Sequence, residues 1–356
     1  MTDVGAIHVV LPGLGGAWTA GGLLIARRAA ELLDHHRPTD VVLSVDPEPG
    51  LPRLDESLVS ARADDVFLVT WGPHVHDLVE RLAGRRVVYY AQSGGWGLRL
   101  PPTVPVLALS RSLMAYWMER APYQPINLLP PVLDEGCVDP GTERDIDVLV
   151  VARKSTSYLR DHLVPALAER CRLHLQEAFI ERRELVALYQ RSKVYLYSSG
   201  PAWESRWPDV GTWVEGFGFQ PLEALACGCT VFSNLHGGLS DYIEPDVNAF
   251  KLGTHSLEFD RDRVLTAVDG FPMAGGDADA LRRFYSVDAF RHRVERILPA
   301  LDGFFDATAR SAPDIGVPVA PVRRPPADRA AAVARTGLSR AKRLGAQARR
   351  GRMRRR

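Results

Sequence analysis

The stretch from Trp213 to Asn234, WVEGFGFQPLEALACGCTVFSN, contains two glutamates, Glu215 and Glu223, on either side of a glycine-containing turn. Pro221 suits the first turn of a helix, where its missing N–H would have no partner anyway. The apolar residues after it predict a short helix that Gly228 ends, followed by a buried strand. A helix start presents free N–H donors and partial positive charge. The segment therefore brings an acid and an anion-binding helix end to one place.

The two acids have E-x7-E spacing, and the text EGFGFQPLEALACG is followed by a predicted strand and HGGLSDYI. This combination resembles retaining glycosyltransferases with the two-domain GT-B fold, in particular glycosyltransferase family 4 (glycosyl transferases group 1). The resemblance covers most of residues 1–308 and is strongest over residues 184–252. The spacing alone leaves an alternative, which is a βαβ unit in which Glu223 caps its own helix.

The resemblance implies roles for both acids. In the resembled family the first acid and the amides of the following turn hold the donor sugar, which implies this role for Glu215. The second acid takes the ribose hydroxyls of the nucleotide, which implies this role for Glu223. The turn residues implied to contact the donor are Gly216, Phe217, Gly218 and Phe219.

Length and composition indicate a globular protein with two domains. At 356 residues the chain is long enough for two cores, and its hydrophobic share of 46% is ordinary for such proteins. The four cysteines are too few and irregular for a disulfide framework, and Cys227 and Cys229 lack the second pair of a zinc site. This cysteine usage favours a reducing compartment.

Short apolar runs alternate with longer amphipathic segments, a pattern typical of parallel sheets covered by helices. Six runs predict buried strands in a first domain: residues 7–11, 41–45, 66–70, 87–90, 106–109 and 126–129. Four more predict strands in a second domain: residues 147–151, 172–176, 194–198 and 230–232. The predicted fold is α/β of the GT-B type, with two Rossmann-like doubly wound parallel-sheet domains facing a cleft and a basic C-terminal tail. Ligands of open α/β folds bind beyond the carboxyl ends of the strands.

The domain boundaries follow from composition and from the resemblance. Residues 1–140 are the expected acceptor-side domain, and residues 141–288 are the expected nucleotide-sugar donor domain. A passage rich in proline and acids forms the hinge between them. Residues 289–308 predict a helix that returns to the first domain, as in GT-B enzymes. Residues 309–356 predict a Pro/Ala linker and a disordered basic tail.

The loop after the first predicted strand, Pro12-Gly13-Leu14-Gly15-Gly16, is rich in glycine. Glycine lets the backbone approach a ligand closely, because no Cβ intervenes. The spacing does not match the G-x-G-x-x-G dinucleotide fingerprint. A glycine pair at this place in the resembled family lies against donor phosphate and acceptor, which implies donor contacts for Gly15 and Gly16. The alternative is a tight strand–helix turn.

The loop after the fourth predicted strand is YYAQSGGWG, in which Gln92 stands near a place where family members often have a histidine. An amide does not titrate, so Gln92 is a candidate for hydrogen bonding to a sugar hydroxyl or to leaving-group charge. Ser93 is a further cleft candidate. His74 and His76, in WGPHVHD after the third predicted strand, are alternative polar contacts or ordinary loop residues.

Arg153 and Lys154 directly follow the strand that opens the second domain. An arginine fork and a lysine point charge can stabilise a leaving diphosphate without a metal. The resembled family has Arg and Lys near this strand end, although separated by several residues, and Arg160 is the substitute if Lys154 points away. Because no D-x-D motif follows an apolar strand, we expect no metal and no other cofactor.

Residues 201–212, PAWESRWPDVGT, place Trp203 and Trp207 in a polar loop just before Glu215. Aromatic faces suit the apolar faces of sugars and also suit a protein core. Because the loop leads into the predicted site, we expect it to border the cleft and to shape donor or acceptor selection.

Charge is distributed unevenly along the chain. Residues 323–356 hold 13 Lys/Arg and one acid, a local charge of +12, so the total of +1 leaves −11 for the first 322 residues. A basic, weakly amphipathic tail can attract anionic lipid headgroups, and we expect residues 327–356 to contact a membrane surface. A solvated tail that contacts the acidic body is the alternative. Nucleic-acid binding is disfavoured because no folded module supports it.

The sequence predicts a glycosyltransferase that moves a hexosyl or deoxyhexosyl group from a nucleotide-diphosphate sugar to a hydroxyl of a glycan or lipid-linked glycan. The resemblance implies retention of anomeric configuration, and the predicted setting is cell-surface polysaccharide or glycolipid synthesis. No apolar run approaches the length of a membrane span or a signal peptide, so the predicted location is cytoplasmic, with peripheral attachment to the inner membrane face. The alternatives are a catalytically silent GT-B scaffold and a nucleotide-sugar epimerase.

Overall fold

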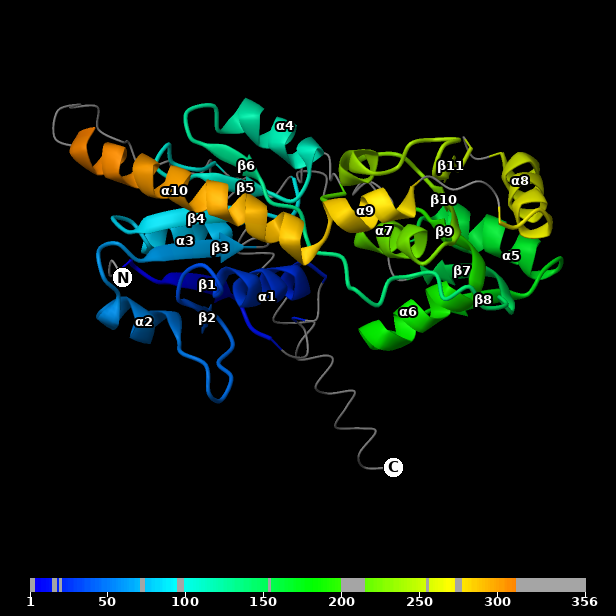
Figure 1. Cartoon of the computed structure of the whole chain (residues 1–356), viewed down its shortest axis with the longest axis horizontal. Helices are drawn as coiled ribbons and strands as arrows, with labels where there is room; N and C mark the ends of the chain where they lie inside the picture. The colour runs from blue at the N-terminus through cyan, green and yellow to red at the C-terminus, as the bar shows by residue number, and fades with distance from the viewer. Residues whose placement is uncertain are drawn as a thin grey trace.

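The protein contains two α/β domains, each built on a parallel sheet and covered by helices (Figure 1). The computed structural model describes residues 4–14, 18, 21–70, 74–94, 99–152, 155–199, 215–253, 256–272 and 277–311. The predicted pair of Rossmann-like parallel-sheet domains is confirmed. Six sites predicted from the sequence lie outside the described residues, namely Gly15, Gly16, Arg153, Lys154, Trp203 and Trp207, as does the basic tail.

The first domain has a six-stranded sheet in the order β2-β1-β3-β4-β5-β6. Every neighbouring pair is parallel. Its strands are β1 (Ile7–Leu11), β2 (Thr39–Leu43), β3 (Val66–Thr70), β4 (Arg86–Ala91), β5 (Val106–Ala108) and β6 (Ile126–Leu128). Its helices are α1 (Gly21–Leu33), α2 (Leu54–Ser60), α3 (Val75–Arg81) and α4 (Arg111–Arg120). All residues of β1 and β3 are buried, because helices cover both faces of the sheet.

The second domain has a five-stranded parallel sheet in the order β11-β10-β9-β7-β8. Its strands are β7 (Ile146–Val151), β8 (Leu173–Gln176), β9 (Ser192–Tyr197), β10 (Thr230–Ser233) and β11 (Phe250–Lys251). The helical elements are η3 (Tyr158–Leu163), α5 (Val164–Ala168), α6 (Arg182–Arg191), α7 (Phe219–Ala226), η5 (Gly237–Asp241), α8 (Leu257–Asp269) and α9 (Ala278–Phe284). The E-x7-E segment lies between β9 and β10 of this sheet, and its second acid, Glu223, is within α7.

One cluster of buried apolar side chains is shared by the two domains. Val9 of β1 belongs to it, whereas Val10 belongs to a second cluster on the other face of the first sheet. Leu149 of β7 also belongs to the shared cluster, whereas Val148 belongs to a third cluster on the other face of the second sheet. This assignment follows from the two-residue period of a strand, which points successive side chains to opposite faces. The inner faces of the two domains are therefore joined by one apolar core.

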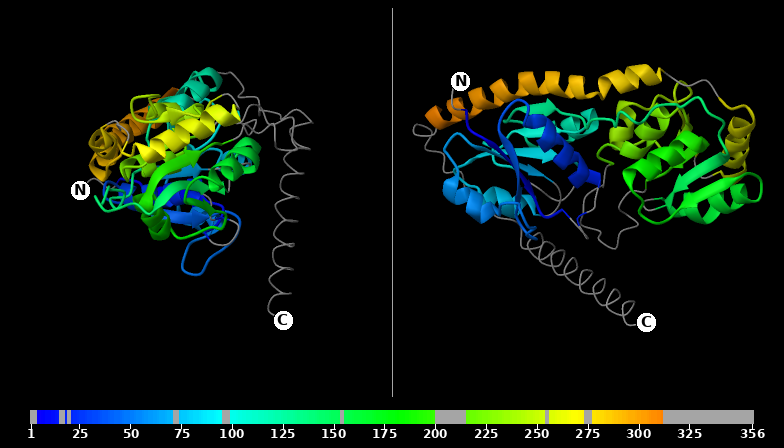
Figure 2. Two further views of the ribbon diagram at one scale, coloured as in Figure 1. Left: turned by 90° about the vertical axis from the view of Figure 1, so that its right-hand side faces the viewer. Right: turned by 60° about the horizontal axis from the view of Figure 1, so that its bottom comes forward.

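A long helix, α10 (Val287–Ser311), extends from the second domain along the first (Figure 1). Figure 2 shows the same helix lying beside the first sheet. Arg37 Nη1 lies 3.1 Å from Asp302 of this helix, and Arg86 Nη2 lies 2.8 Å from Asp306. These ion pairs hold the end of the described chain against the first domain. No helix among the described residues is long and apolar enough to span a membrane.

The hinge passage is fixed to the second domain by the buried guanidinium of Arg144. Its Nη1 donates to the carbonyl oxygen of Ser192 (2.6 Å), and its Nη2 donates to that of Cys227 (2.7 Å). Nη2 also lies 3.0 Å from Asp139 Oδ1. A buried cation is stable only when its donors are satisfied. This network therefore fixes the start of the second domain against Cys227 at the C-terminal end of α7.

Candidate functional site

The glycine turn before α7 lies at the contact between the two domains. Ser110, which caps α4 of the first domain, donates from Oγ to the main-chain oxygen of Gly216 (2.8 Å). A Cβ at Gly216 would overlap the main-chain oxygen of Gln92, in the loop after β4. Only glycine permits this approach. The turn predicted to hold a sugar thus lies where the first domain meets the second.

Glu215 directly precedes this turn and is 7% exposed. Tyr197, the last residue of β9, donates from its hydroxyl to Glu215 Oε2 (2.8 Å). The main-chain N–H of Gly238 donates to the main-chain oxygen of Glu215 (2.7 Å). A carboxylate has about four acceptor positions, so one phenol leaves capacity for further donors such as sugar hydroxyls.

The backbone of the turn is shaped by neighbouring glycines and aromatic rings. Gly218 has φ of 72°, in the left-handed region, and forms the N-cap of α7 without a side-chain cap bond. Phe217 is buried and packs against Tyr242 and Tyr285, with ring centroids 5.5 Å from each. The side chain of Phe217 therefore belongs to the core. Any ligand contact from Phe217 therefore comes from its main chain.

Glu223, within α7, is 1% exposed. Nη1 of Arg182, the first residue of α6, lies 2.5 Å from Glu223 Oε1. Burial raises the pKa of Glu223 to about 7, and the charge of Arg182 opposes this rise. Asp134 of the hinge adds to it. Glu223 is therefore a carboxyl that titrates near neutral pH.

Gln92 lies at the first-domain side of the contact. Its side chain is buried, at 7% exposed, and neither Nε2 nor Oε1 has a hydrogen-bond partner among the described residues. A buried amide without partners costs about 1–3 kcal/mol, so its persistence favours a ligand at this position. Ser93 follows it in the same loop and is half-buried.

Polar residues that the sequence did not single out gather beyond the ends of β9 and β10. Asn234 Nδ2 donates to the main-chain oxygen of Ser199 (2.7 Å), and the N–H of Ser199 donates to Asn234 Oδ1 (3.2 Å). His236 Nε2 lies 3.0 Å from Ser199 Oγ. The histidine that opens HGGLSDYI and the polar ends of the two strands were the available signals for this group.

His74 and His76 belong to the α3 region. His74 is the N-cap residue of α3, and its ring lies edge-on to that of Trp18, with centroids 6.0 Å apart. His76 Nδ1 lies 3.4 Å from Glu80 one turn along the same helix. Ligand atoms of His76, Asp77 and Glu80 lie within 4.8 Å of one another, and both acids are exposed. Such grouping is common on exposed helices and is no evidence for a metal site.

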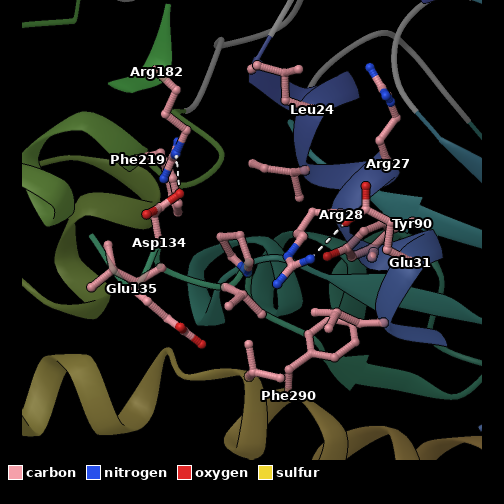
Figure 3. A pocket seen from close by; sticks show the side chains of 18 of the residues that line it. Leu24, Arg27, Arg28, Glu31, Tyr90, Asp134, Glu135, Arg182, Phe219 and Phe290 are labelled. Carbon is pink, nitrogen blue, oxygen red and sulfur yellow. Dashed lines mark hydrogen bonds and ion pairs between the residues drawn. The ribbon is translucent and has the colours of Figure 1, made fainter. Parts of the chain in front are cut away.

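A cavity of about 670 Å³ lies between the domains on the side of the hinge (Figure 3). The first domain contributes α1 and Tyr90, the second contributes Arg182 and Phe219, and α10 contributes Phe290. Arg28 lies 2.8 Å from Glu31 on the α1 wall. Neither Glu215 nor Glu223 lines the cavity. Arg182 and Phe219 line it and lie between the cavity and Glu223.

Residues 167–258 match the family model described as glycosyl transferases group 1. A comparison with curated proteins finds no match. Among solved structures, the chain is similar to a glycosyltransferase from Rickettsia africae (11% identity, 87% of this chain and 98% of that chain covered, TM-score 0.54). AviGT4, a glycosyltransferase involved in avilamycin A biosynthesis, is similar at 17% identity (84% and 98% covered, TM-score 0.56).

Anabaena HepE, solved in complex with UDP-glucose, is similar at 14% identity (83% and 100% covered, TM-score 0.57). These structural likenesses extend over both domains, and the family match covers the E-x7-E segment and the strands on either side of it. The chain is a glycosyltransferase with the GT-B fold, similar over residues 167–258 to the glycosyl transferases group 1 family.

Proposed function

We propose that this glycosyltransferase transfers a sugar from a nucleoside diphosphate sugar to a hydroxyl of a glycan or lipid-linked glycan. The observation that carries the proposal is the position of Glu215 and its glycine turn. They lie at the carboxyl end of β9, against Gln92 and Ser110 of the other domain. Ligands of open α/β folds bind at such strand ends. A nucleotide sugar in the related HepE structure supports the choice of donor.

Each end of the donor has its own acid in this proposal. Glu215 accepts hydrogen bonds from sugar hydroxyls, while the main-chain N–H groups from Gly216 to Phe219 contact the donor. Glu223 accepts from the ribose hydroxyls. The buried amide of Gln92 bonds a sugar hydroxyl or the developing negative charge of the leaving group.

The leaving diphosphate needs positive charge as its bond to the sugar breaks. Arg153 and Lys154, just after β7, supply it without a metal, and Gly15 and Gly16 admit the diphosphate closely. The reaction retains anomeric configuration, and the departing diphosphate takes the acceptor proton on the same face of the sugar. Trp203 and Trp207 border the cleft and shape donor or acceptor selection.

The physiological setting in this proposal is cell-surface polysaccharide or glycolipid synthesis. Residues 327–356 attach the enzyme to an anionic membrane surface, because 13 Lys/Arg against one acid in residues 323–356 attract lipid headgroups. Co-sedimentation with phosphatidylglycerol-containing vesicles should fall when residues 327–356 are deleted, and equal co-sedimentation of both proteins contradicts the attachment.

The test of the activity is donor turnover with a panel of UDP-, GDP-, ADP- and dTDP-sugars, with and without glycan acceptors. The wild type should release nucleoside diphosphate from at least one donor, and Glu215→Ala should abolish the release. Turnover that persists in the variant contradicts the role of Glu215, and no turnover by the wild type contradicts the proposal and favours a silent scaffold. Conversion of the donor sugar without an acceptor indicates an epimerase. Proton NMR of the product reports the anomeric configuration, and EDTA should leave the rate unchanged.

A further inference from the structure

Arg182 lies between the interdomain cavity and Glu223. It lines the cavity together with Phe219, and its guanidinium carbon lies 4.8 Å from the centre of the Phe219 ring (Figure 3). Phe219 is four residues before Glu223 in α7, so both point from the same face of that helix. A ligand in the cavity therefore meets Arg182 and Phe219 before it meets Glu223.

Arg182 has two carboxylates within reach. Nη1 lies 2.5 Å from Glu223 Oε1, and Nε lies 3.4 Å from Oδ2 of Asp134 in the hinge. Glu223 Oε1 has no aligned hydrogen bond among the described residues despite this short ion pair. The Asp134 side chain is 46% exposed, whereas that of Glu223 is 2% exposed. The guanidinium thus has a buried partner and a solvated one.

The buried carboxyl depends on this cation for its charge. Burial raises the pKa of Glu223 to about 7, and Arg182 is the neighbour that lowers it most. The other titratable groups that interact with Glu223 supply no positive charge; they are Asp134 and Cys137 of the hinge, Tyr189 of α6 and Tyr195 of β9. Without Arg182, the carboxyl would be neutral at pH 7.

We infer that Arg182 is a positioning residue for the nucleoside end of the donor. It pairs with Glu223 behind the cavity wall, and it yields this carboxylate to the ribose hydroxyls by moving away from it while keeping its hydrogen bond to Asp134. The inference rests on the proposed function, which assigns the ribose to Glu223.

The guanidinium keeps its hydrogen bond to Asp134 in both states, so its charge stays close to Glu223 throughout the exchange. In the free protein it also pairs with Glu223; in the complex, the ribose hydroxyls donate to Glu223 in its place. The face of Phe219 stays beneath the guanidinium in both positions, which favours a cation throughout the movement. Breaking a buried pair without such replacement would leave an uncompensated buried charge.

The test compares Arg182→Ala with Arg182→Lys, and uses Arg183→Ala as the matched control. Arg183 is the next residue of α6, is exposed, and forms no ion pair among the described residues. Donor KM and kcat are measured from pH 6 to pH 9 with the best donor of the panel. At pH 7, Arg182→Ala should raise KM about tenfold, the ratio that corresponds to one charge-assisted hydrogen bond. The value of kcat should change little.

The pH profile distinguishes positioning from a merely structural role. Removal of the cation raises the pKa of Glu223, so the ionised acceptor returns only at higher pH and the KM defect should shrink towards pH 9. Arg182→Lys should recover most of the affinity, and Arg183→Ala should match the wild type. In a Glu223→Gln background, Arg182→Ala should add no pH-dependent change in donor KM.

Several outcomes would overturn the inference. An unchanged KM, or a KM defect equal at all pH values in a variant with wild-type thermal stability, contradicts it and leaves the proposed function intact. A wild type that neither turns over nor binds any of the donors contradicts the proposed function, and the inference then fails with it.

Discussion

Glu215 and Glu223 come from one short segment, and the fold gives them opposite surroundings. Glu215 is met by a neutral phenol, Tyr197, at the contact with the first domain. Glu223 is met by a cation, Arg182, behind the wall of the hinge-side cavity. Both carboxylates are nearly inaccessible, at 7% and 1% exposed.

In the proposed function, one turn and one helix serve the two ends of a donor. A neutral partner leaves the charge of Glu215 available at the place where domains meet. A cationic partner neutralises Glu223 until another donor replaces it. Because an acid at the sugar end affects the reacting group and an acid at the ribose end affects binding, their substitution should separate kcat from KM.

The largest effect should come from Glu215→Gln. The amide keeps the shape but loses the negative charge that accepts from sugar hydroxyls, so kcat/KM should fall about 100-fold or more, as when a single transition-state contact is removed. Steady-state release of nucleoside diphosphate measures it. Glu169→Gln, at an exposed acid after α5, is the control and should match the wild type. A fall in kcat/KM of less than threefold would contradict the proposed role of Glu215 at the reacting sugar.

Gly216→Ala tests whether the Glu215 region depends on close contact between the domains. The new Cβ would overlap the main-chain oxygen of Gln92, which cannot move without shifting β4. We expect a loss of about 1–3 kcal/mol in unfolding free energy or a widened interdomain angle. Thermal unfolding and small-angle scattering measure the two responses. Gly21→Ala is the control, because nothing lies within 4 Å of its added Cβ. Equal stability and equal scattering for both variants would refute the contact.

Glu223→Gln should affect the other end of the donor. The carboxamide replaces one acceptor oxygen by an NH2 donor, so it loses the two-oxygen hold on the ribose hydroxyls, and donor KM should rise about tenfold with little change in kcat. The pH dependence of KM that Glu223 gives the wild type near pH 7 should disappear, because the amide does not titrate. A fall in kcat at unchanged KM would place Glu223 at the reacting sugar instead.

Tyr197→Phe should sharpen the account of Glu215 by removing only its phenolic donor. We expect a loss of about 1 kcal/mol in unfolding free energy and a several-fold fall in kcat, because Glu215 loses the bond that orients it. Tyr158→Phe is the matched control, since its hydroxyl donates to Asp260 Oδ2 (2.7 Å) and its ring packs against the cluster on the other face of the second sheet. That variant should lose stability alone. Equal kinetic losses would show that the effect is not specific to Glu215.

The smallest effect concerns His8, near the amino end of β1 and away from the acids. Hydrogen bonding to Asp40 raises the pKa of His8, with Asp65 adding to the rise against the effect of burial. This stabilisation is fully present below pH 6.5 and is lost as pH rises through the raised folded-state pKa. Urea unfolding from pH 5.5 to 8.5 should show a decline that His8→Gln lacks, while donor KM stays unchanged. A decline that persists in the variant excludes His8 as its source.

The strands and their parallel orientation could be predicted from the sequence, because the apolar runs are short, continuous and bounded by polar turns. β1 and β3 have the predicted bounds, and the other predicted strands differ from the observed ones by one or two residues at one or both ends. The short helices α2 and α3 were not predicted, because seven residues contain too few repeats of the helical period. Such helices are stabilised by packing on the sheet rather than by their own pattern.

The E-x7-E segment could be recognised from its own sequence, but the residues that contact its acids could not. Arg182 and Asp134 are separated from Glu223 by 41 and 89 residues, and their meeting depends on how α6 and the hinge pack around α7. The unpartnered amide of Gln92 is likewise visible only in three dimensions, although its loop was singled out by its place after a strand. Sequence patterns therefore indicated the acids, and the structure supplied the charges that distinguish them.

The most direct test is a crystal structure of the protein with the donor that it turns over, or with the matching nucleoside diphosphate and sugar. The account predicts sugar hydroxyls within hydrogen-bond distance of Glu215, ribose hydroxyls on Glu223, and Arg182 displaced from Glu223 but still bonded to Asp134. A donor bound elsewhere, or one whose sugar and ribose contact neither carboxylate, would contradict it.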